Sequence, residues 1–153
     1  MKIRLEPVTV ASRAAVERLE TAPGQEGFVE SVAECLAEAD RRRCWRPVGV
    51  YDGDALIGFA MYGFFWEYLP FGRLWLDRLL IDRRFQGRGY GRAALAALLE
   101  RLERLEREYH KKRIYLSVVE ANRPAAALYE SFGFRFTGER DTHGERVMCL
   151  RTR

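Results

Sequence analysis

The sequence predicts a single mixed α/β domain that spans residues 1–153, and three observations lead to this prediction. The length of 153 residues, with 48% hydrophobic and 31% charged residues, suits one globular domain with its own core. Two stretches, 73–82 and 113–119, are apolar on both faces, which is typical of strands buried in the middle of a sheet. Segments with the apolar periodicity of helices alternate with such strands along the chain.

The N-terminal half is predicted to contain one strand, two helices and a hairpin. Residues 2–9 alternate weakly between polar and apolar, which indicates a strand, and residues 11–20 show helical spacing. A second helix is expected over 25–40, where apolar residues again recur at helical intervals. Residues 47–52 and 55–65 predict a hairpin, because Asp-Gly separates two strand-like runs.

The C-terminal half is predicted to continue with helix, strand, helix and hairpin. A glycine-rich loop follows the strand expected at 73–82 and leads into a long helix over 91–109. After the strand expected at 113–119, Asn122 should cap a short helix that tolerates Pro124 in its first turn and ends at Gly133. The final segment, FRFTGERDTHGERVMCL, predicts a hairpin with its turn near His143-Gly144.

The loop before the long helix reads FQGRGYGR and predicts an anion-binding cradle. Gly87, Gly89 and Gly91 lack a Cβ, so the backbone can turn tightly and direct successive N–H groups toward one point. The start of the helix adds free N–H groups and the positive end of its dipole. A phosphate or pyrophosphate would satisfy these donors. The alternative is a plain turn with solvated arginines.

Three widespread nucleotide- and nucleic-acid-binding patterns do not fit this loop. A P-loop ends in Gly-Lys-Ser/Thr, whereas Gly91 is followed by Arg92. A dinucleotide fingerprint needs a third glycine, whereas alanine follows Arg92. An RNA-binding pattern can begin like RGYG but continues as a strand, whereas RAAL opens a helix. A phosphate-bearing cofactor of another type is therefore expected.

Composition argues against several classes of protein. The formal net charge of +4 is mild, and the aromatic residues lie in apolar strand patterns rather than among lysines, which argues against nucleic-acid binding. Three cysteines without C-x-x-C spacing and two histidines argue against a disulfide framework or a metal site. The start, MKIRLEPVTV, lacks the apolar core of a secretion signal, and no stretch is long enough to span a membrane. We therefore expect a cytoplasmic protein.

Two ordered motifs resemble the GNAT superfamily of acyl-CoA-dependent N-acetyltransferases. QGRGYG at 86–91 resembles the family pattern Q/R-x-x-G-x-G/A and lies between a buried strand and a long helix, as the family requires. IYLSVVEANRPAAALYESFGF resembles the family's later segment of asparagine followed by tyrosine. Runs such as PVGVYDG, FAMYGFF and WLDRLLID are similar to bacterial spermine/spermidine (diamine) acetyltransferases. This resemblance implies a mixed, mostly antiparallel sheet that is splayed between two central strands, with helices on both faces.

The resemblance further implies that acetyl-CoA binds in the V between the splayed strands. The backbone of 79–81 would pair with the pantetheine arm like an additional strand, and the glycine loop would hold the pyrophosphate. The residues expected to bind the cofactor are Leu79, Leu80, Ile81, Gln86, Gly87, Arg88, Gly89, Tyr90, Gly91, Arg92, Asn122, Arg123 and Pro124.

In such enzymes the amine attacks the thioester directly, and a tyrosine, here Tyr129, protonates the departing thiolate. A polyamine nitrogen must first lose a proton, and Asp77 is expected to take it or to bind the substrate. The reason is that an acid in an otherwise apolar strand is costly to leave ionised without a partner. Two plainer interpretations stay open: Asp77 pairs with Arg78 or Arg83, and Tyr129 is a core aromatic residue.

Carboxylates are expected to bind the amine substrate. Glutamates recur every four residues along 26–38, and such a row of like charges brings no gain to a helix. Glu67 and Tyr68 offer a carboxylate beside aromatic rings for cation–π contact, unless they form the surface of a homodimer. The residues expected to bind the substrate are Glu26, Glu30, Glu67, Tyr68, Asp77 and Glu120.

Other functions remain open at this stage. An acetyltransferase of this type could act on an aminoglycoside, an amino acid or a protein N-terminus. A non-catalytic domain that binds nucleic acid or senses acetyl-CoA is a further alternative. An amine panel with acetyl-CoA distinguishes these functions.

Overall fold

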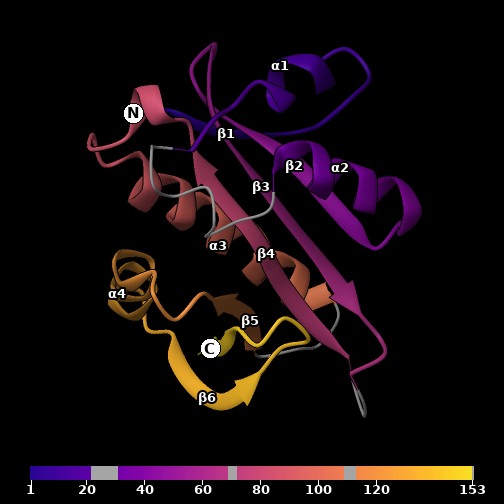
Figure 1. The fold of residues 1–153 in the computed structure, drawn as a ribbon, viewed down its shortest axis with the longest axis vertical. Coiled ribbons are helices and arrows are strands. Elements are labelled where there is room, and N and C mark those ends of the chain that lie inside the picture. The colour runs from indigo at the N-terminus through magenta and orange to yellow at the C-terminus, as the bar shows by residue number, and fades with distance from the viewer. Residues whose placement is uncertain (22–30, 69–71, 109–112, 153) are drawn as a thin grey trace.

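The computed structural model describes residues 1–21, 31–68, 72–108 and 113–152 (Figure 1). In these residues seven strands and four α-helices follow the predicted order, and a short 3-10 turn, η1 (Arg83–Phe85), precedes the glycine loop. The strands are β1 (Ile3–Pro7), β2 (Trp45–Asp52), β3 (Ala55–Phe65), β4 (Arg73–Ile81), β5 (Arg113–Val118), β6 (Arg135–Arg140) and β7 (Arg146–Arg151). The helices are α1 (Arg13–Glu17), α2 (Val32–Arg41), α3 (Tyr90–Glu108) and α4 (Arg123–Ser131).

The seven strands form one sheet in the order β1-β2-β3-β4-β5-β7-β6. Neighbouring strands are antiparallel except for β4 and β5, which are parallel. In the described parts of the chain these two central strands pair only at Leu74↔Ile114 and Trp75↔Tyr115. Beyond these pairs they separate, while β4 stays paired with β3 on its other side as far as Ile81. The prediction of a sheet splayed between two central strands is confirmed.

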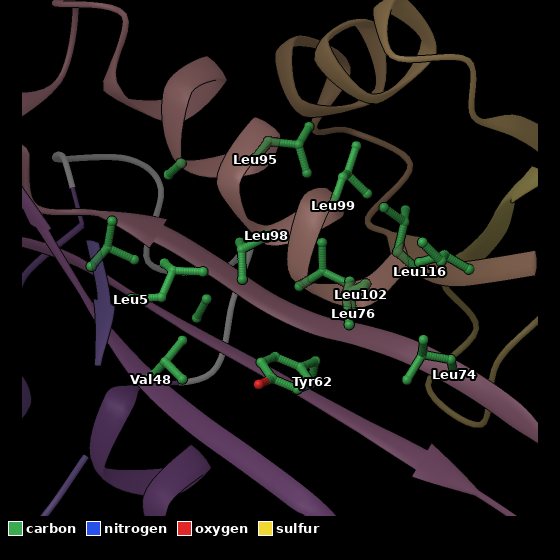
Figure 2. Packing of buried hydrophobic residues seen from close by; sticks show 14 of the residues in the cluster. Leu5, Val48, Tyr62, Leu74, Leu76, Leu95, Leu98, Leu99, Leu102 and Leu116 are labelled. Atoms are coloured by element: carbon green, nitrogen blue, oxygen red, sulfur yellow. The ribbon is translucent and has the colours of Figure 1, made fainter. Parts of the chain in front are cut away.

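Helices cover both faces of the sheet, and a separate apolar cluster lies on each face. On one face, α3 directs the fully buried Leu98 and Leu102 toward β4, where Leu76 lies beside Leu102 (Figure 2). On the other face, α1 and α2 bury Val16 and Leu36 against β2 and β3. This arrangement confirms the predicted mixed α/β class with helices on both faces.

Polar caps set where two of the helices begin. Asn122 caps α4, as predicted. Ser31 caps α2, and its hydroxyl accepts the backbone N–H of Glu34 at 3.1 Å. Because Ser31 has an extended backbone with ψ of 155°, the prediction of a continuous helix over 25–40 is wrong at Ser31, and α2 begins at Val32. Residues 25–30 of that prediction lie outside the described residues. The Ser31 cap therefore interrupts the helical spacing that the sequence shows across this position.

β4 carries a bulge at Asp77. Met61 pairs with Arg78, and Tyr62 pairs with Leu76, so Asp77 is the extra residue in the ladder with β3. A bulge bends its strand and changes the direction of the side chains around it. This bulge follows the last pair between β4 and β5, so β4 changes course where the sheet opens.

Candidate active site

A cleft of about 300 Å³ lies beside the C-terminal end of β4. Its walls come from β4, the glycine loop, the start of α3 and one side of α4. Thr21, Phe85, Ala125 and Leu128 also line it, although the sequence did not single them out. The predicted cofactor residues in its lining are Leu79, Leu80, Ile81, Gln86, Gly87, Gly89, Tyr90, Gly91, Asn122 and Pro124.

The glycine loop has two residues in the left-handed region of the backbone, Gly87 with φ of 77° and Gly89 with φ of 82°. Among the described residues, a Cβ at Gly87 would meet nothing within 4 Å, and one at Gly89 would meet only the Cε of Met1 at 3.7 Å. The space beside the loop is therefore open. Helix α3 begins directly afterwards, and its first N–H groups have no partner within the helix. These features fit an anionic group of a ligand.

Hydrogen bonds fix the loop to the end of β4. Asp82 is only 2% exposed and accepts the N–H of Glu20 at 3.0 Å, the N–H of Arg84 at 3.0 Å and the Nε–H of Arg84 at 2.7 Å. Burial alone would raise the pKa of Asp82, but these bonds outweigh burial and lower the pKa. Gln86 donates from Nε2 to the carbonyl of Ile81 at 2.9 Å. The loop is thus held in place by a stably ionised carboxylate and an amide.

The three arginines predicted to bind the cofactor lie beyond the cleft lining. Arg88 lies over the ring of Phe85, with its Cζ 5.7 Å from the ring centroid. Arg92 donates to the hydroxyl of Ser131 at 3.2 Å, which ties it to α4. Arg123 is exposed at the first position of α4. Their contact with the cofactor stays a prediction.

Tyr129 lies on α4 and lines the cleft. Its ring packs edge-on against Phe134, with centroids 5.9 Å apart. Burial raises the pKa of Tyr129 to about 12, although the positive charge of Arg78 acts in the opposite direction. The hydroxyl therefore keeps its proton at neutral pH and is able to donate it.

A second cavity, of about 420 Å³, lies next to the bulge of β4, and we call it the acidic cavity. Consecutive residues of β4 line the two cavities, Arg78 the acidic cavity and Leu79 the cleft, and they lie where β4 has separated from β5. A cavity that combines negative charge with aromatic rings suits a cationic ligand. Its described lining holds five carboxylates (Glu38, Glu67, Asp77, Asp141 and Glu145), two arginines (Arg42 and Arg78) and four aromatic residues (Trp45, Phe65, Tyr68 and Trp75).

Glu67, Tyr68 and Asp77 are the predicted substrate residues that the acidic cavity brings together. Glu67 pairs with Arg42 at 2.9 Å. Asp77 has one carboxylate oxygen 3.9 Å from the Nε of Arg78, so the pairing that the sequence left open is present. Burial raises the pKa of Tyr68. The cavity therefore holds acidic side chains that already have arginine neighbours.

The other predicted substrate residues lie elsewhere. Glu120 pairs with Arg140 at 3.6 Å, is 68% exposed, and lines neither cavity. Glu26 and Glu30 lie outside the described residues.

Sequence reasoning missed Asp141 and Glu145 in the lining of the acidic cavity. These residues flank the predicted turn near His143-Gly144, so the sequence does signal an acidic pair at a hairpin turn. The sequence does not show which strands and helices this turn lies against, because their packing depends on contacts between segments that are distant along the chain. Glu38, which also lines the cavity, was part of the acidic row but was not among the residues expected to bind the substrate.

The described residues contain no group of three or more His, Cys, Asp or Glu side chains that could hold a metal ion. In the same parts of the chain, the helices are too short or too polar to cross a membrane.

Comparison with known proteins identifies the family. Residues 13–134 match the model of the Acetyltransferase (GNAT) family. A spermine/spermidine N(1)-acetyltransferase from Bacillus subtilis (strain 168) is 46% identical over 151 residues, which is 97% of each chain. A probable spermine N(1)-acetyltransferase from Bacillus subtilis subsp. natto is 45% identical with the same coverage.

Solved structures share the fold. An acetyltransferase from Thermus thermophilus has a TM-score of 0.68 at 22% identity, covering 99% of this chain and 97% of that one. The PaiA N-acetyltransferase from Thermoplasma acidophilum in complex with coenzyme A has a TM-score of 0.66 at 16% identity, covering 99% of each chain. The resemblance expected from the sequence is confirmed, and the chain belongs to the GNAT family of acetyltransferases.

Proposed function

We propose that this protein transfers the acetyl group of acetyl-CoA to a primary amine of a polyamine such as spermine or spermidine. The observation that carries the proposal is the acidic cavity, which adjoins the cleft along β4. A chain with a formal charge of +4 attracts a polycation only where its carboxylates are concentrated. The name of the 46% identical relative supports the same substrate class.

In this proposal acetyl-CoA occupies the cleft. The backbone of 79–81, which has no pairing with β5, would bind the pantetheine arm as an added strand. The loop over 86–91 and the start of α3 would hold the pyrophosphate, for which the open space at Gly87 and Gly89 is suited. The proposed site is completed by Arg88, Arg92, Asn122, Arg123 and Pro124.

The proposed chemistry is a direct attack in a ternary complex. The thioester supplies an electrophilic acetyl carbon, and the deprotonated amine attacks it. Tyr129 gives its proton to the departing thiolate, and its pKa of about 12 keeps that proton in place at neutral pH. Asp77 lies in the bulge of β4 where the cavities adjoin, and it would hold the ammonium group or take its proton.

The rest of the polyamine would lie in the acidic cavity. Glu67 and Tyr68 would contact a second ammonium group, which would compete with Arg42 for the Glu67 carboxylate. Glu26, Glu30 and Glu120 are proposed as further carboxylates that attract the polycation over a longer distance.

A homodimer is also part of the proposal. Trp66 is 66% exposed and packs edge-on against Phe64, with ring centroids 4.7 Å apart. Exposed tryptophan is enriched at protein–protein interfaces. Sedimentation of the purified protein measures its mass, and a monomer at all concentrations would contradict this part.

An amine panel tests the function. Spermine, spermidine, a mono-amine of similar length, kanamycin and a short peptide are each incubated with acetyl-CoA, and the released thiol is measured. We expect the two polyamines to have the highest kcat/KM. Acetylation of kanamycin or the peptide without that of polyamines would show that the substrate class is wrong. Binding of acetyl-CoA without any turnover would indicate a sensor.

A further inference from the structure

The turn between β6 and β7 brings two carboxylates, Asp141 and Glu145, into the acidic cavity. Its backbone is closed by hydrogen bonds from the Asp141 N–H to the Glu145 carbonyl at 2.9 Å and from the Gly144 N–H to the Asp141 carbonyl at 3.0 Å. The Oδ1 of Asp141 accepts the N–H groups of His143 and Glu145, both at 2.9 Å. The turn itself therefore stabilises the negative charge of Asp141.

Glu145 is the member of the pair that takes up a proton more readily. Ser117 on β5 donates its hydroxyl to the Oε2 of Glu145 at 3.1 Å. Burial raises the pKa of Glu145, and the charge of Asp141 raises it further. Burial acts on Asp141 in the same sense, but hydrogen bonds, among them those from the N–H groups of His143 and Glu145, outweigh burial and lower the pKa of Asp141. Asp141 accepts two backbone N–H groups and Glu145 accepts one hydroxyl, so the hydrogen bonds favour the charged form of Asp141 and leave Glu145 as the better proton acceptor.

Asp77 lines the same cavity with a different neighbour. Its carboxylate is 3.9 Å from the Nε of Arg78, and Arg78 also donates to the Asp77 backbone carbonyl at 2.9 Å. The guanidinium already balances the charge of Asp77. Arg78 also lowers the pKa of Glu145, but the neighbouring carboxylate of Asp141 raises it more strongly, because like charges favour the protonated form of one of them. Of these two acids, Glu145 is therefore in the better environment for a base.

We propose that Glu145 is the base that accepts the proton of the attacking ammonium group, and that Asp141 is the fixed anion that holds this group in the cavity. Asp77 is then left to bind a neighbouring part of the substrate. The inference rests on the proposed acetylation of an amine.

The proton balance of this step is complete. An N–H bond of the ammonium breaks, an O–H bond forms on the Glu145 carboxylate, and the nitrogen keeps the electron pair with which it attacks the acetyl carbon. Tyr129 protonates the departing thiolate and regains a proton from the new amide nitrogen. Glu145 then releases its proton to solvent. Both side chains return to their initial state, and one proton leaves for each acetyl group transferred.

Glu145→Gln is the first test. The glutamine has the same shape, and its Oε1 still accepts the Ser117 hydroxyl, but it cannot take a proton. We expect kcat with the best amine of the panel to fall about 10²-fold, as for a lost general base. The dissociation constant of acetyl-CoA, measured by calorimetry, should stay unchanged. Glu139→Gln is the matched control, because Glu139 lies in the same hairpin, pairs with Arg73 at 2.7 Å and lines neither cavity.

Glu145→Ala adds a measurement that a packing role would not change. It leaves room for a small carboxylate, so added formate should restore part of kcat in this variant and have no such effect on the wild type or on Glu145→Gln. A glutamine variant as fast as the wild type overturns the inference, and so does an alanine variant that formate leaves slow. If the wild type acetylates another amine and no polyamine, the proposed substrate class fails, and the same variants assayed with that amine still decide the role of Glu145.

Discussion

The cleft and the acidic cavity adjoin along β4 but are built by different means. The cleft comes mainly from two stretches of chain, 79–91 and 122–129, and its features are open backbone, two left-handed glycines and a helix start. The acidic cavity takes its charged and aromatic side chains from α2, the loop between α2 and β2, β2, β3, the loop after β3, β4 and the β6–β7 turn. The first site depends on backbone conformation and the second on charge. Conformational substitutions should therefore damage one site, and charge-neutralising substitutions the other.

The largest effect is expected for Tyr129→Phe, which tests whether the cleft takes part in the chemistry. The substitution removes the hydroxyl and keeps the ring that packs against Phe134. We expect kcat to fall about 10²-fold, at the lower end for a lost general acid because a thiolate leaves readily. Steady-state kinetics measure kcat, and calorimetry should show unchanged affinity for acetyl-CoA. A kcat close to that of the wild type would make Tyr129 a packing residue.

The next largest effect is expected for Gly89→Val, compared with Gly138→Val. The two glycines have φ of 82° and 89°, and the space around each lacks close protein atoms, so both substitutions should cost about 1–2 kcal/mol of stability. Only Gly89 lies in the cleft lining. The dissociation constant of acetyl-CoA should rise about tenfold, or 1.4 kcal/mol, in Gly89→Val alone. Equal affinities in the two variants would refute the assignment of the loop to the pyrophosphate.

A smaller effect is expected for Glu67→Gln, compared with Glu120→Gln. Both residues are exposed and ion-paired, but only Glu67 lines the acidic cavity. Loss of its charge leaves Arg42 unbalanced, so KM for spermine should rise about fivefold, or about 1 kcal/mol. Added salt should also raise this KM. If Glu120→Gln raises KM as much as Glu67→Gln does, the attraction comes from the whole surface rather than from the cavity.

The smallest effect is expected in the pH profile of kcat. Tyr129 acts while protonated, so its contribution is present below its pKa and is lost as the pH rises through that value. With a pKa of about 12, it should cause no fall in kcat between pH 7 and 10. The profile is measured at saturating substrates. A fall in kcat near pH 9 that Tyr129→Phe abolishes would show that the bound enzyme holds this hydroxyl in a less buried state.

The fold could be predicted to a large extent because its signals are local. Strands that are apolar on both faces, leucines at helical spacing and the Asn122 cap can each be recognised from a few neighbouring residues, and each indicates one strand or helix. The error at Ser31, just before α2, arose from two competing local signals. The acidic row continues the helical spacing to Glu26, but Ser31 provides the cap, and the hydroxyl bond to Glu34 places the start at Val32.

The candidate site was also predictable only where its signals are local. The glycine loop was visible in the sequence, because a positive φ requires glycine at these positions and the motif is continuous. The bulge at Asp77 and the pairing of Asp77 with Arg78 depend on the register with β3, which the sequence does not reveal. The role of Glu145 depends on Ser117 and Asp141, which lie 28 and four residues away along the chain.

The brief pairing of β4 with β5 also divides the sheet into two mechanical halves. Strands β1 to β4 form one continuous ladder and β5 to β7 another, and the seam between them has, among the residues described, only the pairs Leu74↔Ile114 and Trp75↔Tyr115. Local opening should begin at this seam, while α3, which packs across it, keeps the halves together. A strand-like ligand along 79–81 would extend the seam, so amide hydrogen exchange there should slow when acetyl-CoA binds. The bound cofactor would then occupy the position of an additional strand between the two halves of the sheet.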